Sequence, residues 1–557
     1  MSLKKGFCLL CIFLAFIVFV PFVSATCQEE ESLGLRFEIS FPESIHAQPI
    51  TGRVYVMVSD RRSGQPRLFV GTHGIPFFGK DVESLEPGRS VVIDESVFGY
   101  PLESIADIPA GEYSVQGFVN IYTEFKRSDG HTIWLHNDQW EGQKWNISPG
   151  NLFSDAQKVQ LDPAKSQTIK LSCTNVIPPV KVPEDSRWVK RIKFQSKILT
   201  DFWGQPMYLG ATILLPKDYD NHPDVTYPVN YVQGHFGLAP PFGFTPPRTG
   251  GKQSESGYGE NFSKFWVSED CPRMIFVTFQ HPCPYYDDSY AVNSENVGPY
   301  GDAIMQELIP FVEEHFRIIR KPYARVLSGG STGGWESLAL QVFHPDFFGG
   351  TWSLCPDPVD FRHFQCVNIY NDENAFYKKF GWIRVPTGSD RQIDGIMRLT
   401  SKQRNHMELV MGTKNRSGEQ VDIFEAVFGP VGPDGYVKPL FDKRTGVIDP
   451  EVAQYWKENY DLRYILQRDW ATLGPKLVGK LHIYTGDMDT FYLDSAVRRL
   501  EKFLEKTKDP YYDGVIEYGD RQPHCWGPPL PDMVKMMAEH IAKNAPEGEK
   551  TSAWKYK

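Results

Sequence analysis

The stretch Ser328–Trp335, with the sequence SGGSTGGW, constrains the fold of this 557-residue chain more than any other. An apolar run, Ala324–Leu327, precedes it, and a segment of helix-favouring residues follows it. A strand that passes through a glycine turn directly into a helix predicts a sharp bend with a strained, outward-facing serine at Ser331. The pattern G-x-S-x-G alone can arise by chance in a chain with 47 glycines, so its surroundings must decide.

Apolar runs of strand length alternate with helical segments around this turn. Tyr208–Leu215, Tyr227–Val232 and Met274–Phe279 predict strands, and Tyr300–Phe316 predicts an amphipathic crossover helix. This alternation predicts an α/β fold with a doubly wound, mostly parallel sheet. We expect this α/β domain to span residues 187–545 and to carry a long insertion at about 361–475.

The segment 32–178 has a different pattern, in which short β-like runs are separated by turn residues. It predicts an antiparallel β-sandwich-like domain. Tyr113, just inside a long run of this kind, resembles a tyrosine corner. The proline-rich segment Val176–Asp185 indicates a linker between the two domains.

The N-terminus has the features of a signal peptide over residues 1–25. Lys4 and Lys5 precede the apolar run Phe7–Val20, and small residues lead up to Ala25, after which we expect cleavage. Secretion to the periplasm or the extracellular space follows from this hypothesis, with no stable membrane span in the mature chain. An uncleaved anchor or a lipid on Cys27 is the alternative.

Charge and cysteine content narrow the choice of partners. The net charge of -10 argues against nucleic acid as a partner, because phosphate backbones attract basic surfaces. No CxxC pair remains after Ala25, so we expect no structural metal and no cofactor. Two pairs close in sequence, Cys271 with Cys283 and Cys355 with Cys366, are candidate disulfides.

A serine nucleophile needs a base and an acid that orients the base. His524 follows the predicted strand Val515–Tyr518, at the place in the chain order where the base of such a site belongs. Asp487 and Asp489 both follow the preceding strand, and the spacing leaves either as the acid. The oxyanion hole requires two backbone N–H groups, which we assign to Thr332 and to His235 or Phe236. The last two residues lie in the loop after Tyr227–Val232.

Two longer stretches carry a family resemblance. The runs GDAIMQELIPFVEEHFRI and ARVLSGGSTGGWESLALQVFHPDFFGG resemble the esterase family of α/β-hydrolases that includes esterase D, feruloyl esterases and enterochelin esterases. The matching positions are Glu307–Pro310, Ser331 and His344–Gly349. The acid motif of that family resembles Gly486–Tyr492 and favours Asp489 over Asp487, while its histidine corresponds to His524. The family's His-Gly after the third strand is Gln233-Gly-His here.

The resemblance implies a serine esterase that cleaves a carboxylic ester, on a small molecule or linked to a polysaccharide, through an acyl-enzyme. A prolyl-oligopeptidase-like peptidase is one alternative. Another is a non-catalytic carbohydrate-binding or scaffold protein, for which Trp134, Trp140 and Trp145 would form a sugar-stacking surface.

Two acidic segments outside the triad remain to be interpreted. Asp287–Asp288 suits a solvated loop, although it could bind a cation or a charged substrate. Asp357, Asp360, Arg362 and His363 follow the strand after the Ser331 helix, where substrate contact is an option.

Overall fold

The computed structural model describes residues 34–61, 63–246, 258–551 and 554. The predicted signal peptide, its cleavage after Ala25 and Cys27 lie outside these ranges. Within them, no helix is long and apolar enough to cross a membrane.

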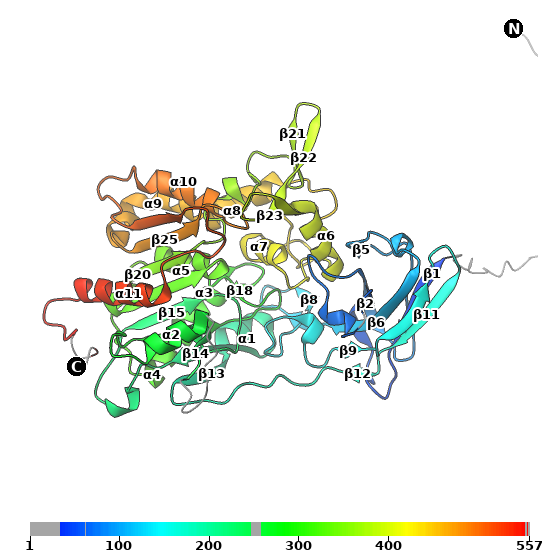
Figure 1. The fold of residues 1–557 in the computed structure, drawn as a ribbon, viewed down its shortest axis with the longest axis horizontal. Helices are drawn as coiled ribbons and strands as arrows, with labels where there is room; N and C mark the ends of the chain where they lie inside the picture. The colour runs from blue at the N-terminus through cyan, green and yellow to red at the C-terminus, as the bar shows by residue number, and fades with distance from the viewer. Residues whose placement is uncertain (1–33, 62, 247–257, 552–553, 555–557) are drawn as a thin grey trace, which may run out of the picture. The chain divides into compact units, whose positions relative to one another are not determined.

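The larger sheet has eight strands in the order β13-β14-β16-β15-β19-β20-β25-β26 (Figure 1). Neighbours are parallel from β16 to β26, whereas β14 is antiparallel to β13 and to β16. The predicted mostly parallel α/β sheet is therefore confirmed, while its doubly wound arrangement stays a prediction. The strands are β13 (Val189–Ser196), β14 (Met207–Leu214), β15 (Val229–Gln233), β16 (Ile275–Gln280), β19 (Arg325–Gly330), β20 (Gly350–Leu354), β25 (Leu481–Gly486) and β26 (Val515–Gly519).

Helices connect these strands. Helix α5 (Thr332–Phe343) packs against β19, β20 and β15, and nearly all of its side chains are buried. Most of these buried residues are small or apolar, as a helix packed inside the fold requires. The other helices outside the insertion are α1 (Lys197–Trp203), α2 (Tyr258–Trp266), α3 (Tyr300–Ala303), α4 (Ile309–His315), α10 (Asp494–Leu504) and α11 (Leu530–Asn544).

The crossover helix predicted over Tyr300–Phe316 is interrupted. A π-helical turn, Ile304–Leu308, separates α3 from α4. Pro310 has no N–H to donate to the preceding turn, which favours a local change in the hydrogen-bond pattern. Glu307 in this turn accepts hydrogen bonds from the Ser196 hydroxyl and from the N–H of Lys197, so it caps the start of α1.

The N-terminal region contains two stacked β-sheets. The first has the order β11-β1-β4, and the second has the order β12-β9-β6-β2-β3-β5 with β10 beside β6. Apolar residues from both sheets share one core, including Ile39, Val56, Val119 and Leu171. The sandwich-like architecture thus follows the alternating pattern, but β1 and β11 are parallel, so the sandwich is not purely antiparallel. The Tyr113 hydroxyl donates to the Pro109 carbonyl over 2.9 Å, the contact of a tyrosine corner.

The bounds of the N-terminal strands are β1 (Leu35–Ser40), β2 (Ile50–Ser59), β3 (Phe77–Leu85), β4 (Val91–Ile93), β5 (Gly99–Tyr100), β6 (Gly111–Ile121), β7 (Thr123–Lys126), β8 (Thr132–Leu135), β9 (Leu152–Phe153), β10 (Gln157–Leu161), β11 (Gln167–Ser172) and β12 (Asn175–Val176). The insertion between β20 and β25 contains β21 (Tyr377–Phe380), β22 (Ile383–Pro386), β23 (Gly388–Arg391), β24 (Met397–Thr400), α6 (Ser401–Met411), α7 (Gln420–Phe428), α8 (Pro450–Tyr460) and α9 (Leu462–Leu477).

Candidate active site

Ser331 lies at the bend between β19 and α5 with a backbone conformation of φ 59° and ψ -122°. A non-glycine residue rarely adopts this conformation, and its presence marks a strained position. The glycines around it are required by close packing. A Cβ on Gly329 would lie 2.2 Å from the Gly333 carbonyl oxygen, and one on Gly333 would lie 2.2 Å from the Gln233 carbonyl oxygen. The glycines of the motif therefore allow the backbone of the serine turn to pack closely against the end of β15.

His524 and Asp489 come from loops after neighbouring parallel strands, β26 and β25. His524 Nδ1 lies 2.7 Å from Asp489 Oδ2, and the Asp489 side chain is fully buried. Asp489 Oδ1 accepts the backbone N–H groups of Phe491 and Leu493, which fixes the carboxylate in place. Among the described residues, Asp487 Oδ1 is buried without a hydrogen-bond partner. The carboxylate that contacts His524 is therefore that of Asp489.

Ser331 Oγ has a different neighbour. It donates to Asp357 Oδ1 over 3.5 Å, and in the described part of the chain no hydrogen bond joins it to His524. Asp357 Oδ2 also accepts from the Tyr290 hydroxyl at 2.7 Å and the Thr332 hydroxyl at 3.0 Å. Burial raises the pKa of Asp357, although these hydrogen bonds oppose the rise. This geometry is compatible with a catalytic serine, because catalytic hydrogen bonds often tighten only when substrate binds.

Asp357 is a site residue whose contact with Ser331 the sequence did not predict. Its one signal was its place after β20, next to the strand that carries the serine. Asp360, by contrast, is fully buried and pairs with Arg362, which is a structural contact.

Backbone groups at the predicted oxyanion positions are available for a ligand. Thr332 is the first residue of α5, so its N–H has no acceptor within the helix. His235 and Phe236 follow β15, and their N–H groups donate to no acceptor within the described ranges. Since Gly333 touches the Gln233 backbone, the two loops lie side by side.

Asp287 and Asp288 are not in a solvated loop, which corrects the expectation from their sequence. Asp287 is 8% and Asp288 1% exposed, and both face His235 Nδ1, at 3.1 and 3.2 Å. The two carboxylates raise the pKa of His235 well above its usual range, although burial opposes this. An acidic pair looks solvent-exposed in sequence, but here the carboxylates are stabilised by a histidine from another loop. The imidazole of His235 and the two carboxylates also lie close enough together to bind a metal ion.

A cavity of about 90 Å³ lies at Ser331 and Asp357. Five of its other lining residues come from the insertion, and the rest follow β20 or β25. These lining residues are Pro358, Gln365, Arg404, Gln420, Val421, Phe424, Phe491 and Leu493. The insertion thus forms one wall of this cavity.

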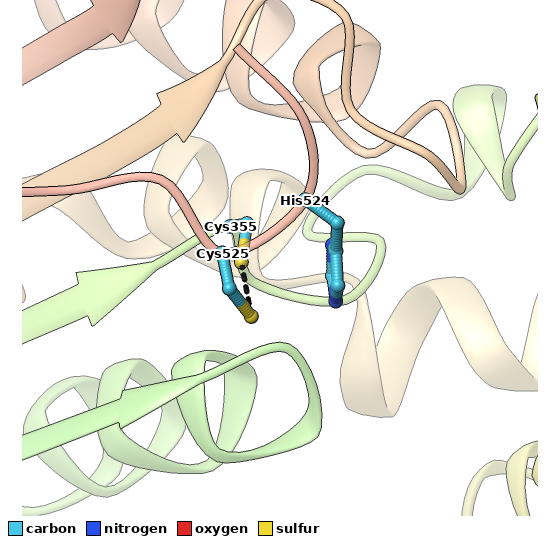
Figure 2. Close-up of side chains that lie close together, drawn as sticks. All are labelled: Cys355, His524 and Cys525. Atoms are coloured by element: carbon cyan, nitrogen blue, oxygen red, sulfur yellow. Dashed lines mark hydrogen bonds between the residues drawn. The ribbon is translucent and has the colours of Figure 1, made fainter. Parts of the chain in front are cut away.

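A pair of cysteines adjoins His524. Figure 2 shows Cys355 and Cys525 with their sulfur atoms toward one another, 3.1 Å apart, beside His524. The predicted pairings of Cys355 with Cys366 and of Cys271 with Cys283 are wrong, because all four are free thiols in the structure and the Cys355 sulfur contacts that of Cys525 instead. Closeness in sequence misled the prediction, since Cys525 is 170 residues from Cys355 and reaches it through the neighbouring strand ends.

Contacts among Cys355, Cys525 and His524 shift the pKa values of these side chains. Hydrogen bonds donated by Cys355 and by His524 lower the pKa of Cys525 to about 5, against the opposing effect of burial. Burial opposes the charged form of His524, but hydrogen bonds with Asp489 and Cys525 outweigh it and raise its pKa to about 10. Burial raises the pKa of Cys355 well above its usual range. At neutral pH the dithiol form therefore pairs a thiolate with an imidazolium.

The strand order and the serine turn after the fifth strand in sequence define an α/β-hydrolase-like fold. Residues 207–420 match the model of the family described as "Putative esterase", so the resemblance predicted from the sequence is confirmed. This match supports a hydrolase as the coarse functional class. No curated protein matches the chain.

Three solved structures illustrate the similarity. A ferulic acid esterase is 14% identical, with 63% of this chain and 99% of that chain covered and a TM-score of 0.36. FphF, a fluorophosphonate-binding serine hydrolase of Staphylococcus aureus, is 14% identical over 63% and 97%, with a TM-score of 0.32. An S-formylglutathione hydrolase from Agrobacterium tumefaciens is 12% identical over 65% and 99%, with a TM-score of 0.35.

Proposed function

We propose that this chain is a secreted serine esterase with Ser331 as nucleophile, His524 as base and Asp489 as the acid that orients it. The observation that carries the proposal is the strained Ser331 turn opening into a cavity, together with the contact between half-buried His524 and fully buried Asp489 at the ends of β26 and β25. The family match supports the ester as the bond cleaved.

In the proposed reaction, Ser331 Oγ attacks the ester carbonyl carbon while its proton passes to His524 Nε2. The carbonyl oxygen becomes negatively charged and accepts hydrogen bonds from the N–H of Thr332 and from that of His235 or Phe236. Each such donor typically lowers the barrier by about 3–4 kcal/mol. His524 then protonates the leaving alcohol, and water hydrolyses the acyl-enzyme by the same steps.

The size of the cavity favours a short acyl chain. Its volume of about 90 Å³ is smaller than the roughly 150 Å³ that holds a benzene molecule in a protein interior. An acetyl group fits such a space, whereas an aromatic acyl group requires the insertion to move. p-Nitrophenyl acetate is therefore the first substrate to test.

The test is labelling with a fluorophosphonate followed by peptide mapping, together with p-nitrophenyl acetate hydrolysis by Ser331→Ala. We expect the label on Ser331 and a loss of kcat of roughly 10³-fold or more in the variant. Ser337→Ala is the matched control, because the Ser337 hydroxyl donates within the same helix to the Gly334 carbonyl oxygen. Full activity in Ser331→Ala would refute the proposal. N-terminal sequencing of exported protein, expected to begin at Thr26, tests secretion separately.

A further inference from the structure

We propose that Cys355 and Cys525 form a disulfide in the mature enzyme, and that this bond frees His524 to act as the base. The effect on His524 rests on the proposed function, whereas the bond itself does not.

The first argument is the placement of the two sulfur atoms. They lie 3.1 Å apart, roughly 1 Å further than the bond of about 2.05 Å in a disulfide. Cys355 is fully buried directly after β20, whereas Cys525 is exposed in the loop after β26. One sulfur is thus held rigidly and the other can be reached by an oxidant. No other pair of described cysteines has its sulfur atoms in contact.

The serine turn also leaves room for the second sulfur. A Cβ on Gly330 would lie 3.2 Å from Cys525 Sγ, so the residue before Ser331 must be small for the sulfur to sit there. Both cysteines have positive φ values, 37° for Cys355 and 61° for Cys525. Few side chains adopt this backbone region without cost, so both loops hold their cysteines in a strained backbone conformation.

The bond can form by thiol–disulfide exchange with a low-molecular-weight disulfide. The Cys525 thiolate attacks one sulfur of that reagent, forming a mixed disulfide and releasing one small thiolate. The Cys355 thiol then loses its proton to the released thiolate and attacks Cys525 Sγ, releasing the second small thiolate. Two electrons pass from the protein to the reagent, and the protein loses the one proton that Cys355 carried.

The consequence for His524 follows from charge. In the reduced form, Cys525 Sγ lies within 4.8 Å of a ring nitrogen of His524, and Asp489 Oδ2 lies 2.7 Å from Nδ1. Asp489 and the Cys525 thiolate together favour the imidazolium form of His524, which has no lone pair with which to accept the proton of Ser331. A disulfide is neutral and removes that thiolate, while the contact with Asp489 remains. We therefore expect the disulfide form to be the more active one at neutral pH.

The experiment uses the full chain exported to an oxidising compartment and purified without reductant. Alkylation with iodoacetamide, digestion and mass spectrometry should find a peptide pair joined through Cys355 and Cys525, with the intact protein lacking two hydrogens. Dithiothreitol should then lower kcat/KM for p-nitrophenyl acetate at pH 7 by roughly tenfold or more. Cys525→Ser should have the same kcat/KM with and without dithiothreitol. Cys173→Ser, which removes a buried thiol of the β-sandwich, should respond like the wild type.

Several results would overturn the proposal. Alkylation of both thiols in the unreduced protein would show that no bond forms, as would bound zinc on unoxidised cysteines. A bond whose reduction leaves kcat/KM unchanged would refute its link to His524. Ser331→Ala separates this question from the proposed function, because it should lose activity yet retain the linked peptide pair.

Discussion

Replacement of Asp489 by Asn tests the proposed triad most directly. In the wild type, Asp489 Oδ1 accepts hydrogen bonds from the backbone N–H groups of Phe491 and Leu493, at 2.8 and 3.2 Å. Asn has the same shape, so its side-chain carbonyl oxygen can still accept both. Its amide group then faces His524 Nδ1 in place of the carboxylate oxygen at 2.7 Å. Because an amide N–H needs an acceptor, His524 would turn to the tautomer with its proton on Nε2, which cannot accept the proton of Ser331.

The expected loss is large because no water can replace the carboxylate at this fully buried position. A change of tautomer in a triad of this type costs about 10⁴-fold in kcat, which corresponds to ~5.5 kcal/mol in the barrier. We expect Asp489→Asn to lower kcat for p-nitrophenyl acetate by about 10³- to 10⁴-fold, with little change in KM. Thermal unfolding should show that the variant folds.

The control is Asp487→Asn, two residues earlier in the same loop. Among the described residues Asp487 Oδ1 has no hydrogen-bond partner, so we expect a change of no more than about fivefold, the factor that 1 kcal/mol represents. If Asp487→Asn were the more damaging change, or if both variants stayed active, the assignment of Asp489 would be wrong.

Two further predictions concern packing and pH. Gly333→Ala should destabilise the fold by about 1–3 kcal/mol in denaturant unfolding, because its Cβ would lie 2.2 Å from the Gln233 carbonyl oxygen; Gly237→Ala, with open space around its Cβ, should be nearly neutral. With reductant present, both shifted pKa values contribute to the free energy of unfolding. The contribution of His524, whose pKa is raised, is complete below pH 6.5 and is lost as the pH rises through about 10. The contribution of Cys525, whose pKa is lowered, is complete above pH 9 and is lost as the pH falls through about 5. The sum of the two contributions is greatest between about pH 6.5 and 9. The difference in unfolding temperature between the wild type and Cys525→Ser should therefore shrink toward pH 5. A difference that does not depend on pH would refute the thiolate–imidazolium pair.

Local sequence signals predicted the elements around Ser331, because strand, glycine turn and buried helix each have a strong local preference. The placement of His524 after its strand also followed, since parallel strands bring their carboxyl ends to one edge of a sheet. The choice between Asp487 and Asp489 did not follow from spacing. Two residues in one loop differ only in which carboxylate the backbone turns inward, and that depends on the N–H groups of Phe491 and Leu493.

Contacts between distant segments were beyond the reach of sequence patterns. Cys355 meets Cys525 across 170 residues, and Asp288 is buried because His235 comes from another loop. The predicted crossover helix contains a π-helical turn at Glu307, whose carboxylate caps a different helix. The sequence patterns pointed to Cys355, Asp288 and Glu307, but the residue that each of them contacts lies in a distant segment of the chain.

The N-terminal sandwich packs against helix α6 of the insertion. Trp145, a candidate for stacking on sugars, is buried and stacks on Tyr55 with ring centroids 4.4 Å apart. Tyr55 in turn belongs to an apolar cluster that includes Met407, Val410 and Met411 of α6. Trp145 therefore packs in the cluster that contacts α6, and its ring is not exposed for stacking on a sugar.

A buried arginine strengthens this contact between sandwich and insertion. Arg53 of β2 is 4% exposed and donates to the Val410 carbonyl oxygen over 2.9 Å, while pairing with Asp81 at 2.7 Å. Helix α6 also carries Arg404, which lines the cavity beside Ser331. A charge buried at an interface is stable only while its hydrogen bonds are kept, so α6 cannot slide on the sandwich without losing them. The sandwich therefore fixes one wall of the cavity, and through Arg404 it contributes to the shape that a substrate meets.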